Sequence, residues 1–431
     1  MTVIDLGELR DDPDEDRREP RPPRSVGRPL RLALVLALVL ATVAGADAGR
    51  ERLPALVPAP TGATPFLAAE RLYVVEPGPD RQSPGTLVAY PLPAAGRRGP
   101  LRPAPLWRAG LPGRGEIFGA LELAGTVVVT GTAVRDDTYL TAAFDRATGT
   151  LRWQQPGVAI SGGRELLVQT GPAQGTTGTV RRVDPATGHA LWSVPSSPDA
   201  LHVGWRDDRV DRLVLVPTEG PVEVWDARSG RRLRAADLAP GALPQYQRAQ
   251  IVDDLLLLLP DASTVIAYGL EKLDRRWQVD LPLVGYLTSC AALICALGQT
   301  GGIRALDRAT GRTVWSDQRG QPVDERDGRL LVTEPGPPGA GPLRLVDAAT
   351  GRVEADLGDW ELVRRLRRDD PPVGVRRAGE DKVLVADLDL AAGAVGNLDV
   401  LVGATGDCQA NPDVLLCSRD DGTFGLWQRE R

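Results

Sequence analysis

Short apolar runs recur along the chain after residue 60. Each is about five residues long and rich in Val and Leu, as in R-L-Y-V-V at 71–75, T-V-V-V-T at 126–130 and K-V-L-V-A at 382–386. Gly, Pro, Asp and Thr flank the runs, which are too short for ordinary helices. The pattern therefore predicts strands that are buried on both faces. After residue 50 it offers one short helix candidate, E-L-V-R-R-L-R-R-D-D at 361–370.

A polar motif is repeated in register with these runs. Residues 142–153 read A-A-F-D-R-A-T-G-T-L-R-W, and residues 304–315 read R-A-L-D-R-A-T-G-R-T-V-W. The motif places Gly four residues after Asp, and Trp four residues after Gly. The complete copies are Asp145, Gly149 and Trp153; Asp184, Gly188 and Trp192; and Asp307, Gly311 and Trp315. The weaker copies keep Asp226 and Gly230, Trp277 alone, or Asp347 and Gly351.

The residue types in the motif suit a turn followed by a packing residue. The Asp side chain can accept hydrogen bonds from the backbone N–H groups that follow it, and Gly can adopt the left-handed conformation that closes a short hairpin. Trp is large and apolar and donates one hydrogen bond, so it suits a wedge between adjacent sheets. The motif is therefore interpreted as a hairpin closure with a packing residue, and not as a ligand site.

The repeat predicts the fold. Successive copies end about forty residues apart, a period typical of stacked supersecondary units. Four strands in each period and no sustained helical pattern indicate an all-β protein, a β-propeller of four-stranded blades. The motif count favours eight blades, within a range of seven to nine. The last strands, at 413–428, lack a motif and are expected to close the ring with strands from the N-terminal end.

The motif A-x-D-x-x-T-G-x-x-x-W resembles the tryptophan-docking repeat of quinoprotein-like propellers. This family includes dehydrogenases that use pyrroloquinoline quinone (PQQ) and the outer-membrane assembly lipoprotein of the BamB type, and the resemblance covers roughly residues 60–430. It implies that Trp153, Trp192, Trp277 and Trp315 dock between blades. The dehydrogenases hold PQQ and calcium with adjacent cysteines and with Glu, Asn and Asp. This chain has no Cys-Cys pair, and Asn occurs only at Asn397 and Asn411. The resemblance is thus BamB-like, with no cofactor expected.

The N-terminal region differs in composition from the repeats. Residues 1–29 mix charge and proline without apolar periodicity, which predicts a disordered tail. Residues 30–48 include fifteen uncharged, mostly apolar positions, which predicts a transmembrane helix or signal anchor. We interpret 49–60 as a linker and 61–431 as the propeller.

The charges around the apolar segment predict its orientation. Six arginines precede it closely and two follow it, so the N-terminus is expected in the cytoplasm and the propeller outside, in a single-pass cell-membrane protein. Ala46-Asp47-Ala48 is a small-x-small sequence, so the alternative is secretion after cleavage near Ala48.

The four cysteines lie in two short intervals, Cys290 to Cys295 and Cys408 to Cys417. Each interval contains a turn candidate between apolar residues, so each pair could bridge neighbouring strands. An even number of cysteines in an exported domain favours two disulfides over free thiols. A metal site is the least favoured interpretation, because the spacing is not C-x-x-C and the histidines number only two.

Charge and chemistry exclude several function classes. The 57 acidic and 51 basic residues are spread along the chain, so there is no basic face for nucleic acid. His189 lies in a motif turn and His202 in L-H-V-G-W, and both are expected to be structural. The pairs Asp136-Asp137, Asp207-Asp208 and Asp253-Asp254 are interpreted as solvated hairpin turns. No catalytic, cofactor-binding or metal residue is assigned.

Two functions follow from these predictions. The leading one is a non-catalytic, membrane-tethered, extracytoplasmic propeller that acts as a binding or scaffold module for a protein or cell-envelope partner. The alternative is a PQQ-dependent quinoprotein oxidoreductase. The first depends on fold analogy for its binding role.

Overall fold

The computed structural model describes residues 54–429, apart from residues 81–82, 95–100, 114, 134–137, 172–177, 197–199, 218, 239–248, 262, 335–340 and 368. The chain divides into two compact units, Met1–Glu51 and Arg52–Arg431. The predicted tail and apolar segment, 1–29 and 30–48, lie outside the described residues. All that follows concerns the second unit.

The described residues form eight β-sheets, and six of these have four strands joined in chain order. The first three comprise β2 (Thr64–Leu67), β3 (Arg71–Glu76), β4 (Thr86–Pro91) and β5 (Trp107–Gly110); β6 (Ile117–Leu123), β7 (Thr126–Ala133), β8 (Thr138–Asp145) and β9 (Leu151–Pro156); and β10 (Val158–Gly162), β11 (Glu165–Thr170), β12 (Thr179–Val183) and β13 (Ala190–Pro195). The next three comprise β14 (Leu201–Arg206), β15 (Arg209–Leu215), β16 (Val222–Asp226) and β17 (Arg232–Ala236); β18 (Ala249–Val252), β19 (Leu255–Leu258), β20 (Thr264–Gly269) and β21 (Arg275–Asp280); and β22 (Val284–Cys290), β23 (Leu293–Gly298), β24 (Ile303–Asp307) and β25 (Thr313–Asp317).

The two remaining sheets are larger. One has seven strands, β26 (Gln321–Arg326), β27 (Arg329–Thr333), β28 (Gly341–Asp347), β29 (Val353–Leu362), β31 (Val373–Arg377), β32 (Lys382–Asp389) and β33 (Ala394–Val402). The other has five, in the order β1 (Ala55–Pro58), β36 (Thr423–Gln428), β35 (Val414–Arg419), β34 (Ala404–Ala410) and β30 (Arg364–Arg365).

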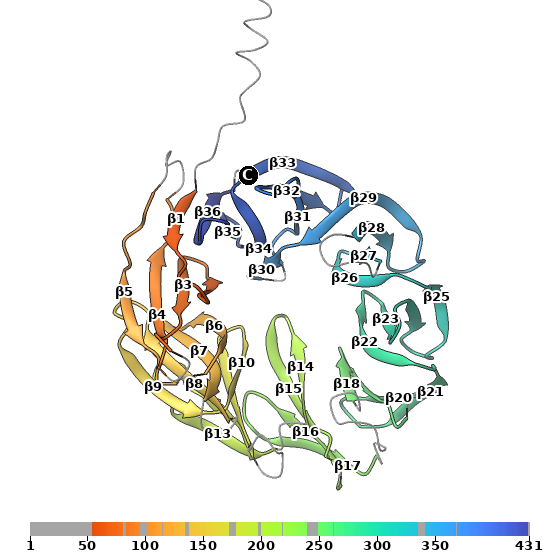
Figure 1. Ribbon diagram of the computed structural model, residues 1–431. Helices are drawn as coiled ribbons and strands as arrows, with labels where there is room; N and C mark the ends of the chain where they lie inside the picture. The colour runs from red at the N-terminus through yellow and green to blue at the C-terminus, as the bar shows by residue number, and fades with distance from the viewer. Residues whose placement is uncertain are drawn as a thin grey trace, which may run out of the picture. The chain divides into compact units, whose positions relative to one another are not determined.

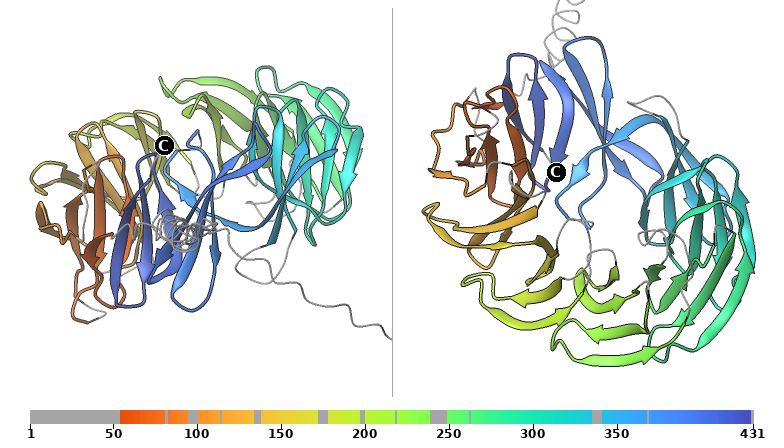
Figure 2. Two further views of the ribbon diagram at one scale, coloured as in Figure 1. Left: turned by 90° about the horizontal axis from the view of Figure 1, so that it is seen from above. Right: turned by 60° about the horizontal axis from the view of Figure 1, so that its bottom comes forward.

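The sheets follow one another around a ring in chain order, with the first strand of a sheet toward the centre and the last outside, as for β18 and β21 (Figure 1). The two further views keep this order (Figure 2). The apolar runs form the second strands: Val127, Val128 and Val129 of β7 are all buried. The core is divided among the gaps between sheets, where one cluster joins Tyr73 to Phe144 of the next blade. The predicted all-β propeller is confirmed.

Pairing between the two ends of the unit closes the ring. Strand β1 pairs antiparallel with β36, from Ala55 opposite Leu426 to Pro58 opposite Thr423. The predicted closure by N-terminal strands is confirmed. However, β1 lies inside segment 49–60, which the sequence pattern predicted to be a linker. Its Ala55 and Val57 are buried against the last strands, so the propeller begins earlier than expected.

The short helix candidate at 361–370 forms no helix in its described residues, 361–367 and 369–370. Strand β29 continues to Leu362 and pairs with β31, with Glu361 opposite Val375. Strand β30 then pairs parallel with β34, with Arg364 opposite Gln409. A ten-residue helix is marginal by itself in water, so pairing with existing strands outweighs the weak helical pattern.

The prediction of a single-pass membrane protein is corrected. No helix in the described part of the chain is long and apolar enough to cross a membrane. The apolar residues of this part are distributed over short strands, whereas a spanning helix needs about 20 consecutive residues.

Tryptophans join neighbouring blades in one recurring geometry. The indole N–H of each donates to a backbone carbonyl in the motif turn of the next blade: Trp107 to Arg146 (2.8 Å), Trp153 to Pro185 (2.9 Å), Trp192 to Arg228 (3.1 Å), Trp277 to Arg308 (2.8 Å) and Trp315 to Ala348 (2.9 Å). The indole also covers the motif glycine of that turn. A Cβ at Gly149 would lie 2.5 Å from Cε3 of Trp107, and one at Gly311 would lie 2.6 Å from Cε3 of Trp277.

The motif aspartate closes its turn as the sequence predicts. Oδ1 of Asp145 accepts hydrogen bonds from the backbone N–H groups of Ala147 and Thr148, both at 2.8 Å. The Arg152 side chain and the Thr148 N–H lower the pKa of Asp145 to about 2. Gly149 follows with φ of 73°, in the left-handed region that glycine favours.

The junction between the sheets β14–β17 and β18–β21 lacks the tryptophan. Strand β17 carries exposed Arg234 at the motif position, and the next turn has Leu273 in place of Gly. The turn itself is kept, since the N–H of Leu273 donates to the carbonyl of Gly269 at 2.7 Å. Leu273 adopts φ of 54° and is buried in a cluster with Leu233 of β17. An apolar leucine thus replaces the tryptophan and glycine pair.

Both cysteine pairs form disulfides. Cys290 and Cys295 join β22 to β23, and Cys408 and Cys417 join β34 to β35, with Cα–Cα distances of 5.5 Å and 4.2 Å. Each bridge links two neighbouring strands of one sheet. Both are buried, so they stabilise the sheets and do not form an exposed redox site.

We predict that Gly149→Ala destabilises the protein more than Gly125→Ala. Both glycines have left-handed φ, 73° and 75°, so both substitutions carry a backbone cost of about 1–2 kcal/mol. A Cβ at Gly125 meets nothing within 4 Å, whereas one at Gly149 overlaps Trp107, which adds about 1–3 kcal/mol. Urea unfolding measures both, and equal losses would contradict the docking geometry.

We also predict a pH-dependent contribution from the motif aspartates. Hydrogen bonds, led by those from Arg152 in Asp145 and from Thr310 in Asp307, lower the carboxyl pKa values. Each carboxylate therefore stabilises the fold above the unfolded value of about 3.9, and this contribution is lost as pH falls through the folded value. A variant with Asn at Asp145, Asp184, Asp307 and Asp347 should melt below the wild type at pH 6. The difference should shrink between about pH 4 and 2, and a constant difference would refute this.

Candidate binding cleft

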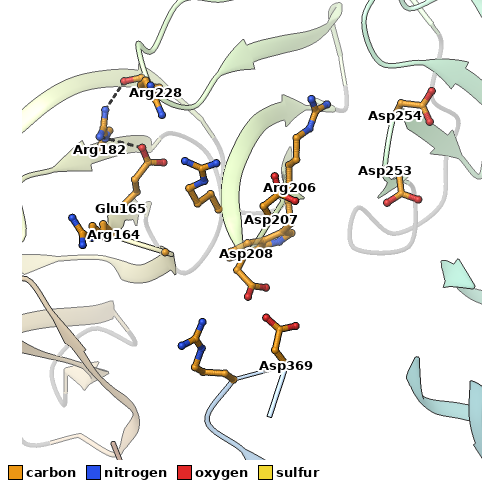
Figure 3. Close-up of a pocket in the computed structure, with 14 residues that line it drawn as sticks. Arg164, Glu165, Arg182, Arg206, Asp207, Asp208, Arg228, Asp253, Asp254 and Asp369 are labelled. Atoms are coloured by element: carbon orange, nitrogen blue, oxygen red, sulfur yellow. Dashed lines mark hydrogen bonds and ion pairs between the residues drawn. The ribbon is translucent and has the colours of Figure 1, made fainter. Parts of the chain in front are cut away.

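An open cleft of about 1160 Å³ lies where the first hairpins of three successive blades meet a later segment of the chain (Figure 3). In an antiparallel four-stranded blade, the first hairpin and the motif turn lie at the same end of the sheet. The cleft is therefore on the face of the motif turns. The residues that line it are Gly163, Arg164, Glu165, Arg182, Trp205, Arg206, Asp207, Asp208, Arg209, Arg228, Asp253, Asp254, Arg367 and Asp369.

The central hairpin of the cleft has a fixed backbone. Asp207 and Asp208 connect β14 to β15 and have φ of 50° and 57°, the two left-handed residues of a tight hairpin turn. Asp253 has φ of 53° at the corresponding turn between β18 and β19. Aspartate tolerates this conformation better than most residues. The sequence prediction that these pairs occupy hairpin turns is correct, whereas Asp136-Asp137 lies outside the described residues.

Trp205 presents an aromatic surface in the cleft. The register of β14 and β15 shifts between Gly204 and Trp205, and such bulges redirect the side chain that follows. The indole rests on Gly162 of the preceding blade, where a Cβ would lie 2.7 Å from its six-membered ring. Trp205 nevertheless remains 49% exposed. Unlike the docking tryptophans, it is available to a ligand.

Some charges of the cleft are neutralised by neighbours. Arg182 pairs with Glu165 at 3.2 Å and donates to the carbonyl of Arg228 at 2.7 Å (Figure 3). Arg308, outside the cleft, pairs with both Asp253 and Asp254 at 2.8 Å. These contacts neutralise Arg182 and hold the walls, whereas the single charge of Arg308 offsets only one of the two carboxylates at Asp253 and Asp254.

Seven other side chains form no ion pair with any described residue. They are Arg164, Arg209, Arg228, Arg367, Asp207, Asp208 and Asp369, and all are exposed. Asp208 and Arg209 are adjacent in the sequence, but their side chains form no ion pair with each other. The cleft therefore offers hydrated charges of both signs.

The segment after β30 brings Arg367 and Asp369 to the cleft from a distant part of the sequence. Arg365 pairs with Asp324 of β26 at 2.8 Å, and these side chains are only 13% and 4% exposed. Arg365 also donates to the carbonyl of Asp370 at 2.6 Å, and the Asp370 carboxylate accepts from the N–H of Arg367 at 3.1 Å. A buried ion pair thus fixes the segment that completes the cleft.

A family model matches the three blades that supply most of this cleft, while Arg367 and Asp369 lie beyond the match. The family, described as outer membrane protein assembly factor BamB, matches residues 103–254 and, in an overlapping match, residues 176–330. The two matches together span more than half of the chain. The chain belongs to this family. No curated protein matches the sequence.

Solved structures of BamB-type and related propellers are similar to this chain. BamB from Moraxella catarrhalis is 14% identical, over 88% of this chain and 97% of that chain, with a TM-score of 0.39. The computationally designed Ika8 protein is 16% identical, over 74% and 99%, with a TM-score of 0.47. A europium-containing methanol dehydrogenase is 13% identical, over 88% and 85%, with a TM-score of 0.40. At these values the structures give no information on function.

The two asparagines of the chain can be compared with the ligand set that PQQ and calcium would need. Asn411 is buried, its amide donates to the carbonyl of Ala68 at 3.0 Å, and its oxygen accepts from the N–H groups of Asp413 and Val414. It is thus committed to a turn, and Asn397 lies on edge strand β33. Within the described ranges, no group of three His, Cys, Asp or Glu could hold a metal ion. The residues do not fit PQQ and calcium.

The sequence-predicted residues and the cleft hardly overlap. The motif residues lie in turns and between blades, the cysteines lie inside sheets, and His189 and His202 lie outside the cleft lining. The sequence analysis assigned no role to Arg164, Trp205 or Arg367. The available signal was the dense charge at first-hairpin tips, as in W-R-D-D-R at 205–209.

We predict that Arg365→Met destabilises the protein by about 3–5 kcal/mol, because it leaves Asp324 as an unpaired buried charge. Arg352→Met is the control: Arg352 pairs with Glu354 at 3.3 Å but is 73% exposed, so its loss should cost less than about 1 kcal/mol. Urea unfolding measures both. A double variant that also replaces Asp324 by Leu should recover part of the loss, and equal costs for the two single variants would contradict the structural role.

Proposed function

We propose that this propeller is a non-catalytic binding module that holds a protein partner of the cell envelope in the cleft on its motif-turn face. The observation that carries the proposal is the set of unpaired, exposed charges around Trp205 on conformationally fixed hairpins. Exposed aromatic and arginine residues in a concave, preorganised surface are typical of binding sites. The family's description as an assembly factor supports a partner that is a protein.

The two disulfides support a location where such partners occur. Disulfides form and persist in oxidising compartments and are uncommon in the cytoplasm. Both bridges are buried within sheets of the propeller. A partner in the cell envelope is therefore favoured over a cytoplasmic one.

Site-directed photocrosslinking in intact cells tests the binding function. A photoreactive amino acid replaces Leu366, next to Arg367 of the cleft, or Val314 on outer strand β25. Both positions are exposed, by 42% and 51%. We expect a discrete crosslinked protein from Leu366 and none from Val314. Crosslinks of equal yield from both positions, or from Val314 alone, would contradict the proposal.

We predict that PQQ with calcium leaves the melting temperature of the purified protein unchanged. The reason is that the Asn411 side chain already makes its hydrogen bonds within the fold, and each pair of cysteines already forms a disulfide between neighbouring strands. The same mixture should reduce no dye in the presence of alcohols or sugars. A thermal shift together with substrate oxidation would establish the oxidoreductase instead.

A further inference from the structure

The cleft is unsuited to a ligand of a single charge sign. Its unpaired side chains are four arginines and three aspartates, all exposed. A polyanion would meet the aspartates of the central hairpin, and a polycation would meet Arg164 and Arg209. Charges of the wrong sign at an interface cost several kcal/mol. The ligand must therefore place opposite charges at different points.

The two sides of the central hairpin differ in the sign of their charge. Arg164, Arg182 and Arg228 lie on one side of the central hairpin, and Asp253 and Asp254 lie on the other (Figure 3). Arg182 is neutralised by Glu165, so Arg164 and Arg228 supply the free positive charge of that side. Arg308 shares its single charge between Asp253 and Asp254, so a net negative charge remains on the other side.

An apolar surface lies between the charged sides. Trp205 belongs to the central blade of the three, and half of its surface is exposed. A buried aromatic contact at the centre of an interface contributes more to affinity than charges at its rim. Charges around it then determine the orientation and the choice of partner.

The size of the cleft favours an extended segment over a small molecule. Its volume of about 1160 Å³ exceeds the range of about 300–1,000 Å³ typical of small-molecule pockets. It is also open to solvent, and its walls come from three blades and a distant segment, so an extended chain can contact several of them at once.

We propose that the cleft binds an extended protein segment that carries an acidic side chain and a basic side chain with an apolar side chain between them. The acidic residue pairs with Arg164 and Arg228, the apolar residue packs on Trp205, and the basic residue pairs with the aspartates at 207–208 and 253–254. This inference rests on the proposed binding function and specifies the chemistry of the partner.

Selection from a library of random nonapeptides tests the proposal, with the full chain as bait at low salt. We expect the selected peptides to be enriched in sequences with both charge signs around an apolar residue. Their affinity should fall at least tenfold for Arg164→Glu and for Trp205→Ala. It should also weaken with added salt, which screens exposed ion pairs.

A matched pair of variants separates the cleft from the fold. Asp208→Asn and Asp327→Asn each remove one charge at a first-hairpin turn, at φ of 57° and 50°, and asparagine tolerates that conformation. Only Asp208 lines the cleft. We expect Asp208→Asn to reduce peptide affinity at least threefold and Asp327→Asn to leave it unchanged.

The remaining outcomes each decide the proposal. Selected peptides of one charge sign, no enriched peptides, or equal effects of the two asparagine variants would overturn it. If such a result comes with a specific Leu366 crosslink, the binding function stands and only the partner chemistry is wrong. If the crosslink is also absent, the binding function fails as well.

Discussion

The contact between the indole of one blade and the glycine turn of the next is the interaction on which this fold depends. Five tryptophans make it, each with an indole hydrogen bond to the turn and a ring that covers its glycine. The glycine serves two requirements at once, because it has left-handed φ and because any side chain would occupy the space of the ring. A ring of sheets with separate cores needs contacts across its junctions, since no single core holds the blades together, and at the junction after β17 the buried Leu273 takes the place of this pair.

The motif could be predicted from the sequence because its causes are local. The carboxylate of Asp145 accepts hydrogen bonds from the turn that follows it, and the left-handed conformation of Gly149 belongs to the same turn. The short stretch from Asp145 to Gly149 is therefore enough to predict the turn. The partner of the tryptophan follows from the forty-residue period. By contrast, strand β1 and the segment at 361–370 depend on residues far away in sequence. Ala55 lies in a strand because it pairs with the strand of Leu426, and Arg364 because it pairs with the strand of Gln409. Neither pairing can be predicted from the residues nearby in the sequence.

The cleft lies beside the junction at which the motif is degenerate. The central blade, β14–β17, has Arg234 where its neighbours have tryptophan, and the next turn has Leu273 where they have glycine. The hairpins of these two blades supply Asp208 and Asp253 to the cleft. Departures from a repeat are expected where function rather than stability determines the sequence. In the sequence alone these departures are weaker copies of the motif, and only the structure shows that their two blades also carry Trp205, Asp208 and Asp253 of the cleft.

Architecture and binding share residues without conflict because they use different atoms. The backbone carbonyl of Arg228 accepts the indole N–H of Trp192 and a hydrogen bond from Arg182, while its side chain is unpaired and lines the cleft. The turn is thus fixed by contacts that do not involve its side chain. A family that conserves the turn backbone can vary such side chains freely, since the blade junction imposes no requirement on them. The charges that line the cleft can therefore change by substitution at hairpin tips while the ring of blades remains intact.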